Sequence, residues 1–146
     1  MKIYTLGTSN RKPYHFISIL KKYCIEVIFD VRRFPTSKFE HFRGENLKRL
    51  CRENGISYIY FGNELGGYRK GGYFGFTTSK QFKEGIETIY DVARSKVVCI
   101  ICAERFPWKC HRRYIGDALS KKGVEVEHII DIDRSWQPKS DAAASR

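Results

Sequence analysis

The sequence lacks the features of secreted and membrane-embedded proteins. Its N-terminus has no leader of basic, apolar and small residues, and no apolar run approaches the roughly 18 residues of a membrane-spanning helix. The five cysteines are an odd number, which argues against the paired disulfides of a small secreted protein. We therefore expect a cytoplasmic protein that is kept in a reducing compartment and has no membrane partner.

The chain also lacks internal repeats and any shift in composition that would mark a second domain. Its 146 residues, 42% of them hydrophobic, are enough to build one core that covers both faces of a small sheet. We predict a single α/β domain over residues 1–135. Residues 136–146 are mostly small and polar, which predicts a flexible C-terminal tail.

Acidic residues are scarce relative to basic ones. The chain has 16 Asp plus Glu against 27 Lys plus Arg, a formal net charge of +11. A field of this sign concentrates polyanions and phosphate groups, and its alternative role is general solubility. Because the basic residues stand beside aromatic ones and are not confined to a tail, we predict a nucleic acid or a nucleotide as partner.

Apolar runs alternate with helical patterns along the chain. Each of the first four strand-sized runs precedes a stretch in which apolar residues recur every three to four positions. Since right-handed crossovers place helices on both faces of a parallel sheet, this alternation predicts a three-layer Rossmann-like α/β sandwich with a mainly parallel sheet of about five strands. Strands are expected at residues 2–6, 25–29, 56–61, 97–101 and 124–130, and helices at 13–23, 45–54, 79–94 and 110–122. The glycine-rich residues 62–76 are expected to form a long loop without regular structure.

The residues that follow the first four predicted strands are unusually polar. They are residues 7–11 (GTSNR), 30–37 (DVRRFPTS), 62–67 (GNELGG) and 102–113 (CAERFPWKCHRR). In an open α/β sheet the ligand crevice lies beyond the carboxyl ends of the strands. We therefore expect these four groups to meet at one edge of the sheet and to form the functional site.

Four segments carry a resemblance to a known family. The segments YTLGTSN (4–10), DVRRFPTS (30–37), ELGG (64–67) and CAE with CHR (102–104 and 110–112) resemble the hallmarks of the domain of unknown function 488 family. The resemblance covers about residues 2–130. That first motif often has His where this chain has Thr8, so a proton-transfer role for the position does not carry over. The resemblance points to these segments as the site without naming a reaction.

The first turn has two interpretations. Gly7 is followed by small hydroxyl residues that lead into a predicted helix, which resembles a reduced phosphate cradle. The turn lacks both the glycine spacing of dinucleotide folds and the Gly-Lys-Ser/Thr ending of a P-loop. It fits equally an ordinary turn in which Ser9 or Asn10 caps the helix. We take Thr8, Ser9 and Asn10 as candidate substrate-binding residues.

The second strand is predicted to end in Asp30, two residues before Arg32. One interpretation is an ion pair that holds the loop. The other gives Arg32 a phosphate or carboxylate through its bidentate fork, with Asp30 as orienting group or general base. We predict Asp30 as catalytic and Arg32 as substrate-binding, and we add Arg33, Ser37 and Glu64 to the candidate substrate-binding residues.

The segment from Cys102 to Arg112 argues against a structural zinc site and excludes a cysteine-phosphatase loop at Cys102. Adjacent Cys110 and His111 rarely coordinate one ion, and no second cysteine pair supplies further ligands, so we predict no metal. A cysteine-phosphatase loop would need Arg six residues after Cys102, where the sequence has Trp108. No cofactor is predicted either.

The same segment contains a thiol, Cys110, near a predicted helix N-terminus. The helix dipole, His111 and Arg112 would favour a Cys110 thiolate and would bind anions, so Cys110 is either a nucleophile or a packed thiol. Glu104 is either a general acid or base, or the partner of a salt bridge to Arg112 or Arg32. We predict Glu104, Cys110 and His111 as catalytic and Arg112 as substrate-binding.

The predicted long loop interleaves aromatic residues with cations. Residues 68–76 (YRKGGYFGF) are typical of a lid or a base-stacking surface, or else of a disordered insertion. We predict Arg69, Lys70 and Tyr73 as nucleic-acid-binding residues.

Three functions fit these observations, of which the third is a thiol-dependent or metal-dependent regulator. The first is an enzyme that cleaves a phosphoester or N-glycosidic bond in nucleic acid or nucleotides, as a hydrolase or a glycosylase. The second is a non-catalytic nucleic-acid or nucleotide-binding module that uses the same cations. An acid or base beside an anion-lined pocket would favour the enzyme, and a filled edge with an exposed basic face would favour the binder.

Overall fold

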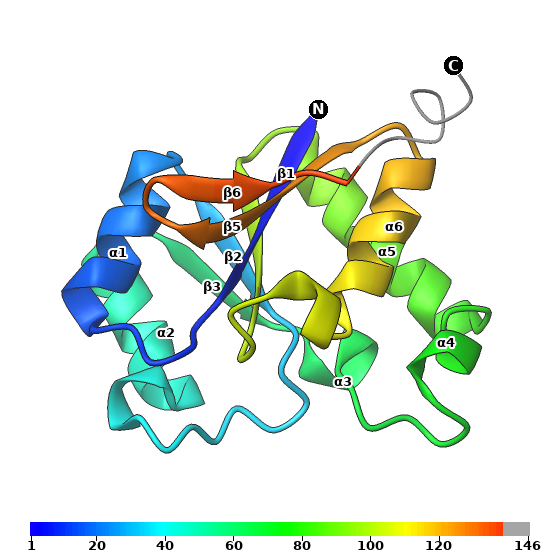
Figure 1. Ribbon diagram of the computed structural model, residues 1–146, viewed down its shortest axis with the longest axis horizontal. Helices are drawn as coiled ribbons and strands as arrows, with labels where there is room; N and C mark the ends of the chain where they lie inside the picture. The colour runs from blue at the N-terminus through cyan, green and yellow to red at the C-terminus, as the bar shows by residue number, and fades with distance from the viewer. Residues whose placement is uncertain (139–146) are drawn as a thin grey trace.

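A computed structural model describes residues 1–138 of the chain (Figure 1). The predicted mainly parallel α/β sandwich is confirmed, and its sheet has one strand more than the expected five. The strands are β1 (Lys2–Gly7), β2 (Val27–Asp30), β3 (Ser57–Tyr60), β4 (Val98–Cys102), β5 (Glu125–Asp131) and β6 (Arg134–Trp136). The α-helices are α1 (Pro13–Lys22), α2 (Gly44–Glu53), α3 (Gly62–Leu65), α4 (Tyr73–Phe76), α5 (Lys80–Ala93) and α6 (Arg112–Lys121). Short 3-10 helices occur at η1 (Glu40–Phe42) and η2 (Pro107–Lys109).

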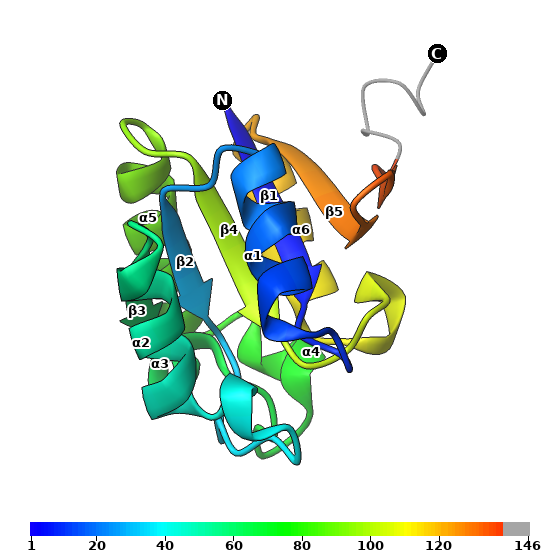
Figure 2. The ribbon, with the colours of Figure 1, turned by 90° about the vertical axis from the view of Figure 1, so that its left-hand side faces the viewer.

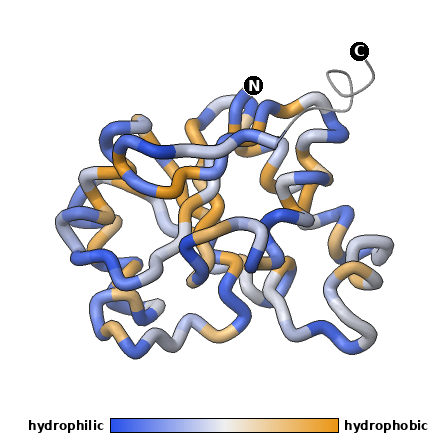
Figure 3. Tube along the Cα trace, in the orientation of Figure 1, coloured by the Kyte–Doolittle hydropathy of each residue, from blue (hydrophilic) through white to orange (hydrophobic). Residues whose placement is uncertain are grey.

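The sheet has the order β3-β2-β4-β1-β5-β6, with β6 alone antiparallel to its neighbour. Helices α1 and α2 cover one face and α5 and α6 cover the other (Figure 2). The buried apolar side chains form one cluster on each face of the sheet. Much of the hydrophobic sequence lies in the strands (Figure 3). β4 is buried along its whole length, as expected of a central strand with helices on both faces.

Two expectations were wrong. The glycine-rich segment contains α3 and α4 and is not a loop throughout, because Leu65 and Tyr73 anchor it to the core beneath α5. Trp136 belongs to β6, so the sheet extends past the boundary predicted at residue 135. The rest of the predicted tail, from residue 139 onward, lies outside the described residues. Within residues 1–138 we find no helix that has both the length and the apolar character needed to cross a bilayer.

Candidate functional site

The loops after β1, β2 and β4 meet at the carboxyl edge of the sheet. The backbone N–H of Thr8 donates to the carbonyl of Cys102 at 2.7 Å, and the N–H of Ser9 donates to Ala103 at 2.9 Å. Gly7 permits this approach, because a Cβ there would lie 1.8 Å from the carbonyl oxygen of Glu104. The N–H of Val31 donates in turn to Ile101 at 2.9 Å. The topology therefore gathers these segments as the sequence predicts.

Asp30 and Arg32 form a buried ion pair at the end of β2. Arg32 Nε and Nη2 donate to the two carboxylate oxygens at 2.8 and 2.7 Å, and Nη1 donates to the carbonyl of Phe42 at 2.6 Å. Tyr58 donates its hydroxyl to the same carboxylate at 2.5 Å. Arg32 is 6% exposed and Asp30 is fully buried. This geometry fits the structural interpretation of the pair and leaves the Arg32 fork occupied.

The pair also perturbs the titration of its neighbours. Burial and the adjacent Asp30 charge raise the pKa of Tyr58 far above its usual range, so its hydroxyl stays protonated. Burial by itself would lower the pKa of Arg32, but the hydrogen bonds and charge of Asp30 outweigh it, and the net shift is upward. Tyr58 is thus neutral and Arg32 is charged at neutral pH.

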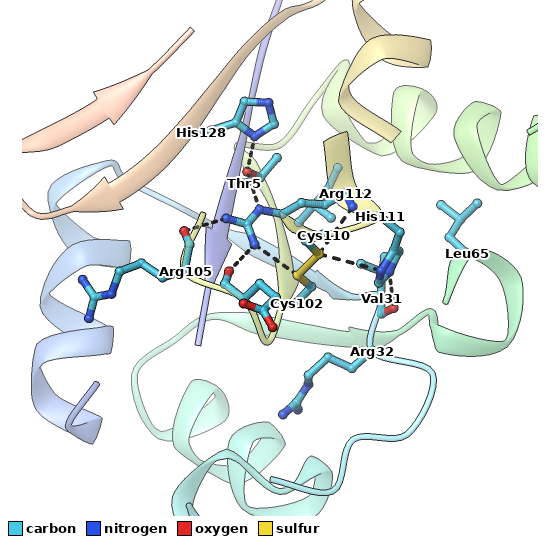
Figure 4. The surroundings of a disulfide bond; sticks show 12 residues. Thr5, Val31, Arg32, Leu65, Cys102, Arg105, Cys110, His111, Arg112 and His128 are labelled. Carbon is cyan, nitrogen blue, oxygen red and sulfur yellow. Dashed lines mark hydrogen bonds between the residues drawn. A yellow bond between two sulfur atoms is a disulfide. The ribbon is translucent and has the colours of Figure 1, made fainter. Parts of the chain in front are cut away.

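Arg112 is the largest fully buried side chain of the described residues, with 0% exposure. Its Nε donates to Thr5 Oγ1 at 3.0 Å and its Nη2 donates to the carbonyl of Arg105 at 2.9 Å. Its Nη1 donates to the carbonyl of Glu104 and lies 3.1 Å from Cys102 Sγ (Figure 4). Burial lowers the pKa of Arg112 to about 10, and the guanidinium still carries its charge at neutral pH. An anion could reach Arg112 only if this network were given up.

The network continues from Arg112 to His128. Because Thr5 Oγ1 accepts from Arg112, its own proton is free to donate to His128 Nδ1 at 2.6 Å. Burial and the nearby Arg112 charge lower the pKa of His128 to about 4, so this imidazole is neutral. Sequence reasoning missed His128, which lies within a strand and outside the loops we searched.

Cys102 and Cys110 are joined by a disulfide next to Arg112. The odd cysteine count did not predict it, and Cys24, Cys51 and Cys99 are free. His111 lies beside the bridge, with Nδ1 3.7 Å from Cys110 Sγ and Nε2 3.0 Å from the carbonyl of Val31. Burial lowers the pKa of His111, which keeps the ring neutral.

The first turn is not a helix cap of the expected kind. α1 begins at Pro13, its N-cap residue is Lys12, and no side chain caps it, so the alternative in which Ser9 or Asn10 caps the helix is wrong. Thr8 is buried, and Asn10 Oδ1 accepts from Arg105 at 3.2 Å. Thr8 is therefore closed off from solvent, whereas Ser9 is half-buried and Asn10 is exposed.

Arg11 closes this turn from inside. Its Nε donates to the carbonyl of Gly7 at 2.9 Å and its Nη2 to the carbonyl of Ile130 at 2.6 Å. Its Nη1 has no hydrogen bond within residues 1–138 and faces Asp131 at 3.7 Å. Since the guanidinium is balanced by a neighbouring carboxylate, we count Arg11 as a brace of the turn.

The remaining predicted residues divide by exposure. Ser37 accepts from the backbone N–H of Phe39 at 3.0 Å and shapes its own loop. Arg33 and Glu64 are half-buried, and Glu104 presents its carboxylate to solvent. Gly66 brings α3 against Arg33, since a Cβ there would lie 2.8 Å from the Arg33 Cα. The side chains of Arg33, Glu64 and Glu104 are therefore available to a ligand at the rim of the carboxyl edge.

The three nucleic-acid-binding residues predicted in the long loop differ in their surroundings. Tyr73 packs against His111 and Tyr114 and donates its hydroxyl to the carbonyl of Leu65 at 2.7 Å. Arg69 donates to the carbonyls of Gly66 and Asn63 at 2.8 and 2.7 Å. Both side chains therefore hold the loop together. Lys70 alone of the three is exposed.

Sequence reasoning missed a partly exposed aromatic cluster, which we call the tryptophan patch: half-buried Phe106 and exposed Trp108 and Trp136, with the cations Lys109 and Arg134. Trp108 stacks on Phe106 at a ring-centroid distance of 5.1 Å and meets Trp136 edge to face at 5.6 Å. Both tryptophans of the protein lie in it, and they are 45% and 41% exposed. Each stands next to or near a cation in the sequence, a signal that could have been recognised.

A family model matches residues 12–75 and 70–119. The chain belongs to the family described as Domain of unknown function DUF488. The matched part includes Asp30, Arg32, Glu104 and Arg112, so the buried network is largely a feature of the DUF488 segment. Trp136 lies outside the match. No curated protein and no solved structure matched the chain in the corresponding searches.

The part of the DUF488 chain that the structure describes offers no metal centre. Among residues 1–138 no three His, Cys, Asp or Glu side chains gather closely enough to hold an ion. We divide the carboxyl edge into an inner half, which holds the networks of Arg32 and Arg112, and an outer half, which consists of the exposed loops and strand β6.

Proposed function

We propose that this DUF488 protein binds single-stranded nucleic acid through the outer half of the carboxyl edge. The observation that carries the proposal is the tryptophan patch. Two large aromatic side chains that face solvent side by side lose the benefit of burial and mark a contact surface. Aromatic rings stack on bases of any sequence, and duplexes hide the base faces that such rings would use.

The charges around the patch support a nucleic-acid ligand. Lys109 is exposed beside Trp108. Arg134 and Trp136 are two residues apart on β6, so they project from the same face of the strand. In such a surface the cations bind the phosphates of a single strand while the neighbouring rings stack on its bases.

A second aromatic pair lies on the loops that follow β2 and α3. Phe34 and Tyr68 are both exposed, and their ring centroids are 5.8 Å apart. Arg33 precedes Phe34, and Lys70 follows two residues after Tyr68. Since β2 and β4 are adjacent strands, the pair extends the same edge and offers further stacking positions.

Binding is favoured over catalysis because the inner half is filled. The predicted base Asp30 and the predicted phosphate ligands Arg32 and Arg112 are buried and hydrogen-bonded to one another or to backbone. A hydrolase or glycosylase that uses Glu104 or His111 stays a prediction. Screening damaged, modified and ordinary DNA and RNA, with Glu104→Gln as control, tests it.

The test of binding is fluorescence anisotropy with labelled oligothymidylate, oligouridylate and a duplex. Trp108→Ala should weaken single-strand binding about tenfold, since stacking is worth about 1–3 kcal/mol per base. Lys109→Ser should lower the slope of log affinity against log salt by about 1.

Matched controls come from two helices that do not belong to the tryptophan patch. Tyr14→Ala removes an exposed aromatic from α1, and Lys48→Ser removes an exposed cation from α2. Both should bind as the unsubstituted protein does. Equal losses in all four variants, or no binding at low salt, would remove nucleic acid as the ligand of this surface.

A further inference from the structure

The sulfur atoms at the inner half of the edge have a chemistry that nucleic-acid binding does not use. Cys102 ends β4, and Cys110 lies immediately before the start of α6, eight residues further along the chain. The three remaining cysteines form no disulfide. Burial raises the pKa of Cys51 to about 12 and raises that of Cys99 as well, so both stay thiols, and Cys24 is exposed without a partner sulfur.

The surroundings of Cys102 favour a thiolate when the bridge is reduced. Arg112 is buried and positively charged, and among residues 1–138 its hydrogen-bond partners are carbonyls, a hydroxyl and Cys102 Sγ, with no carboxylate. A buried cation without a counter-charge in direct contact is unfavourable. A Cys102 thiolate 3.1 Å from Nη1 supplies that charge.

Cys110 has a base beside it. The carbonyl of Val31 can only accept, so His111 Nε2 carries the ring proton and the lone pair of Nδ1 faces the Cys110 sulfur. The backbone N–H of Arg112 also points at this sulfur, at 3.5 Å. Cys110 is half-buried whereas Cys102 is 1% exposed, so a small oxidant meets Cys110 first.

We propose that Cys102 and Cys110 are a reversible redox couple that hydroperoxides oxidise. His111 accepts the Cys110 proton, and the thiolate attacks the outer peroxide oxygen. An S–O bond forms and the O–O bond breaks, which gives a sulfenic acid and an alkoxide or hydroxide that takes up a proton. The Cys102 thiolate then attacks the Cys110 sulfur and expels hydroxide, which takes a proton and leaves as water. Overall, two thiols and one hydroperoxide give a disulfide, water and an alcohol, or a second water when the oxidant is hydrogen peroxide.

The test uses the full chain, reduced and then freed of reductant. One equivalent of hydrogen peroxide should remove two thiols per molecule, and peptide mapping should link Cys102 to Cys110. A dithiol reductant should restore both thiols. Cys24→Ser, which removes the exposed cysteine, should behave in the same way. Persistence of both thiols, or a bridge that involves Cys24 instead, would overturn the proposal.

Two single substitutions separate the roles of the sulfurs. Cys102→Ser should stop at a Cys110 sulfenic acid that dimedone traps, because the resolving thiolate is gone. Cys110→Ser should give neither the bridge nor a dimedone adduct at Cys102. Circular dichroism establishes that each variant is folded, and the bridge in the unsubstituted protein tests the couple without either variant. Dimedone trapping at Cys102 in Cys110→Ser would reverse the assigned order of attack.

The role of His111 has its own readout. In the Cys102→Ser background, Cys110 should react with iodoacetamide at a rate whose pH profile lies below that of an ordinary thiol, whose pKa is about 8.5. His111→Phe should move the profile up toward that value at unchanged fold. A profile that does not move would show that His111 only packs against the thiol.

Discussion

The two halves of the carboxyl edge use similar residues in opposite ways. In the inner half Arg32 and Arg112 are buried, and their guanidinium groups donate hydrogen bonds to other atoms of the protein. In the outer half Lys109, Trp108 and Trp136 face solvent. The difference teaches that an arginine in a strand-end motif can be a structural residue. We call the buried inner half the frame, and the ligand surface consists of the exposed residues that this frame positions.

The inner half contains a second contrast. Arg32 meets the carboxylate of Asp30, so its charge is neutralised by its own loop. Arg112 meets neutral oxygen atoms and a sulfur. The first arrangement holds the structure, and the second would change with the state of Cys102 in the proposed redox couple.

The largest effect is expected where the frame is broken. Arg32→Met would leave the Asp30 carboxylate buried without its partner, which costs about 3–5 kcal/mol of unfolding free energy. Urea denaturation measures the loss. The double variant Asp30→Asn with Arg32→Met should regain part of it, because the uncompensated charge is gone. A single variant as stable as the unsubstituted protein would show that the inner half is not a frame.

A smaller effect should follow from acid. The pKa of His128 falls from 6.5 in the free residue to about 4 in the fold, so the unfolded state binds more protons between these values. The free energy of unfolding should therefore decrease as the pH is lowered through this window, by about 3 kcal/mol over the whole window. His128→Asn keeps an acceptor for Thr5 but cannot titrate, so its unfolding free energy should vary less between pH 7 and about pH 4. Equal slopes in both proteins would assign the acid sensitivity elsewhere.

The smallest effect on stability is expected in the outer half. Trp108→Ala should change the unfolding free energy by about 0.5 kcal/mol or less while it weakens oligonucleotide binding, because the ring is exposed. Tyr14→Ala should be equally mild for stability and leave binding intact. A large loss of stability in Trp108→Ala would show that the tryptophan patch stabilises the fold as the inner half does.

Much of the fold could be predicted from sequence, for identifiable reasons. The apolar runs and helical spacings located five strands and four helices, and the polar strand ends located the edge. β6 was missed because Arg134, Ser135 and Trp136 are all exposed and carry no burial pattern. α3 and α4 were missed because each is a single turn in a glycine-rich segment.

The site was harder to predict, because sequence does not show what is buried. Arg112 stands in a run of basic residues, and only the packing of Thr5, Cys102 and the loop carbonyls around it distinguishes it from exposed Arg113. The Cys102–Cys110 bridge likewise depends on how the loop folds back.

The most direct measurement of the proposed function is intrinsic tryptophan fluorescence during titration with oligothymidylate. Both tryptophans lie in the patch, so no other part of the chain contributes tryptophan emission. Stacking of bases on the rings should quench the emission at low salt, and raising salt from about 50 to about 200 mM should reverse it. Unchanged emission while anisotropy reports binding would place the nucleic acid elsewhere, and no binding by either signal would contradict the proposed function itself.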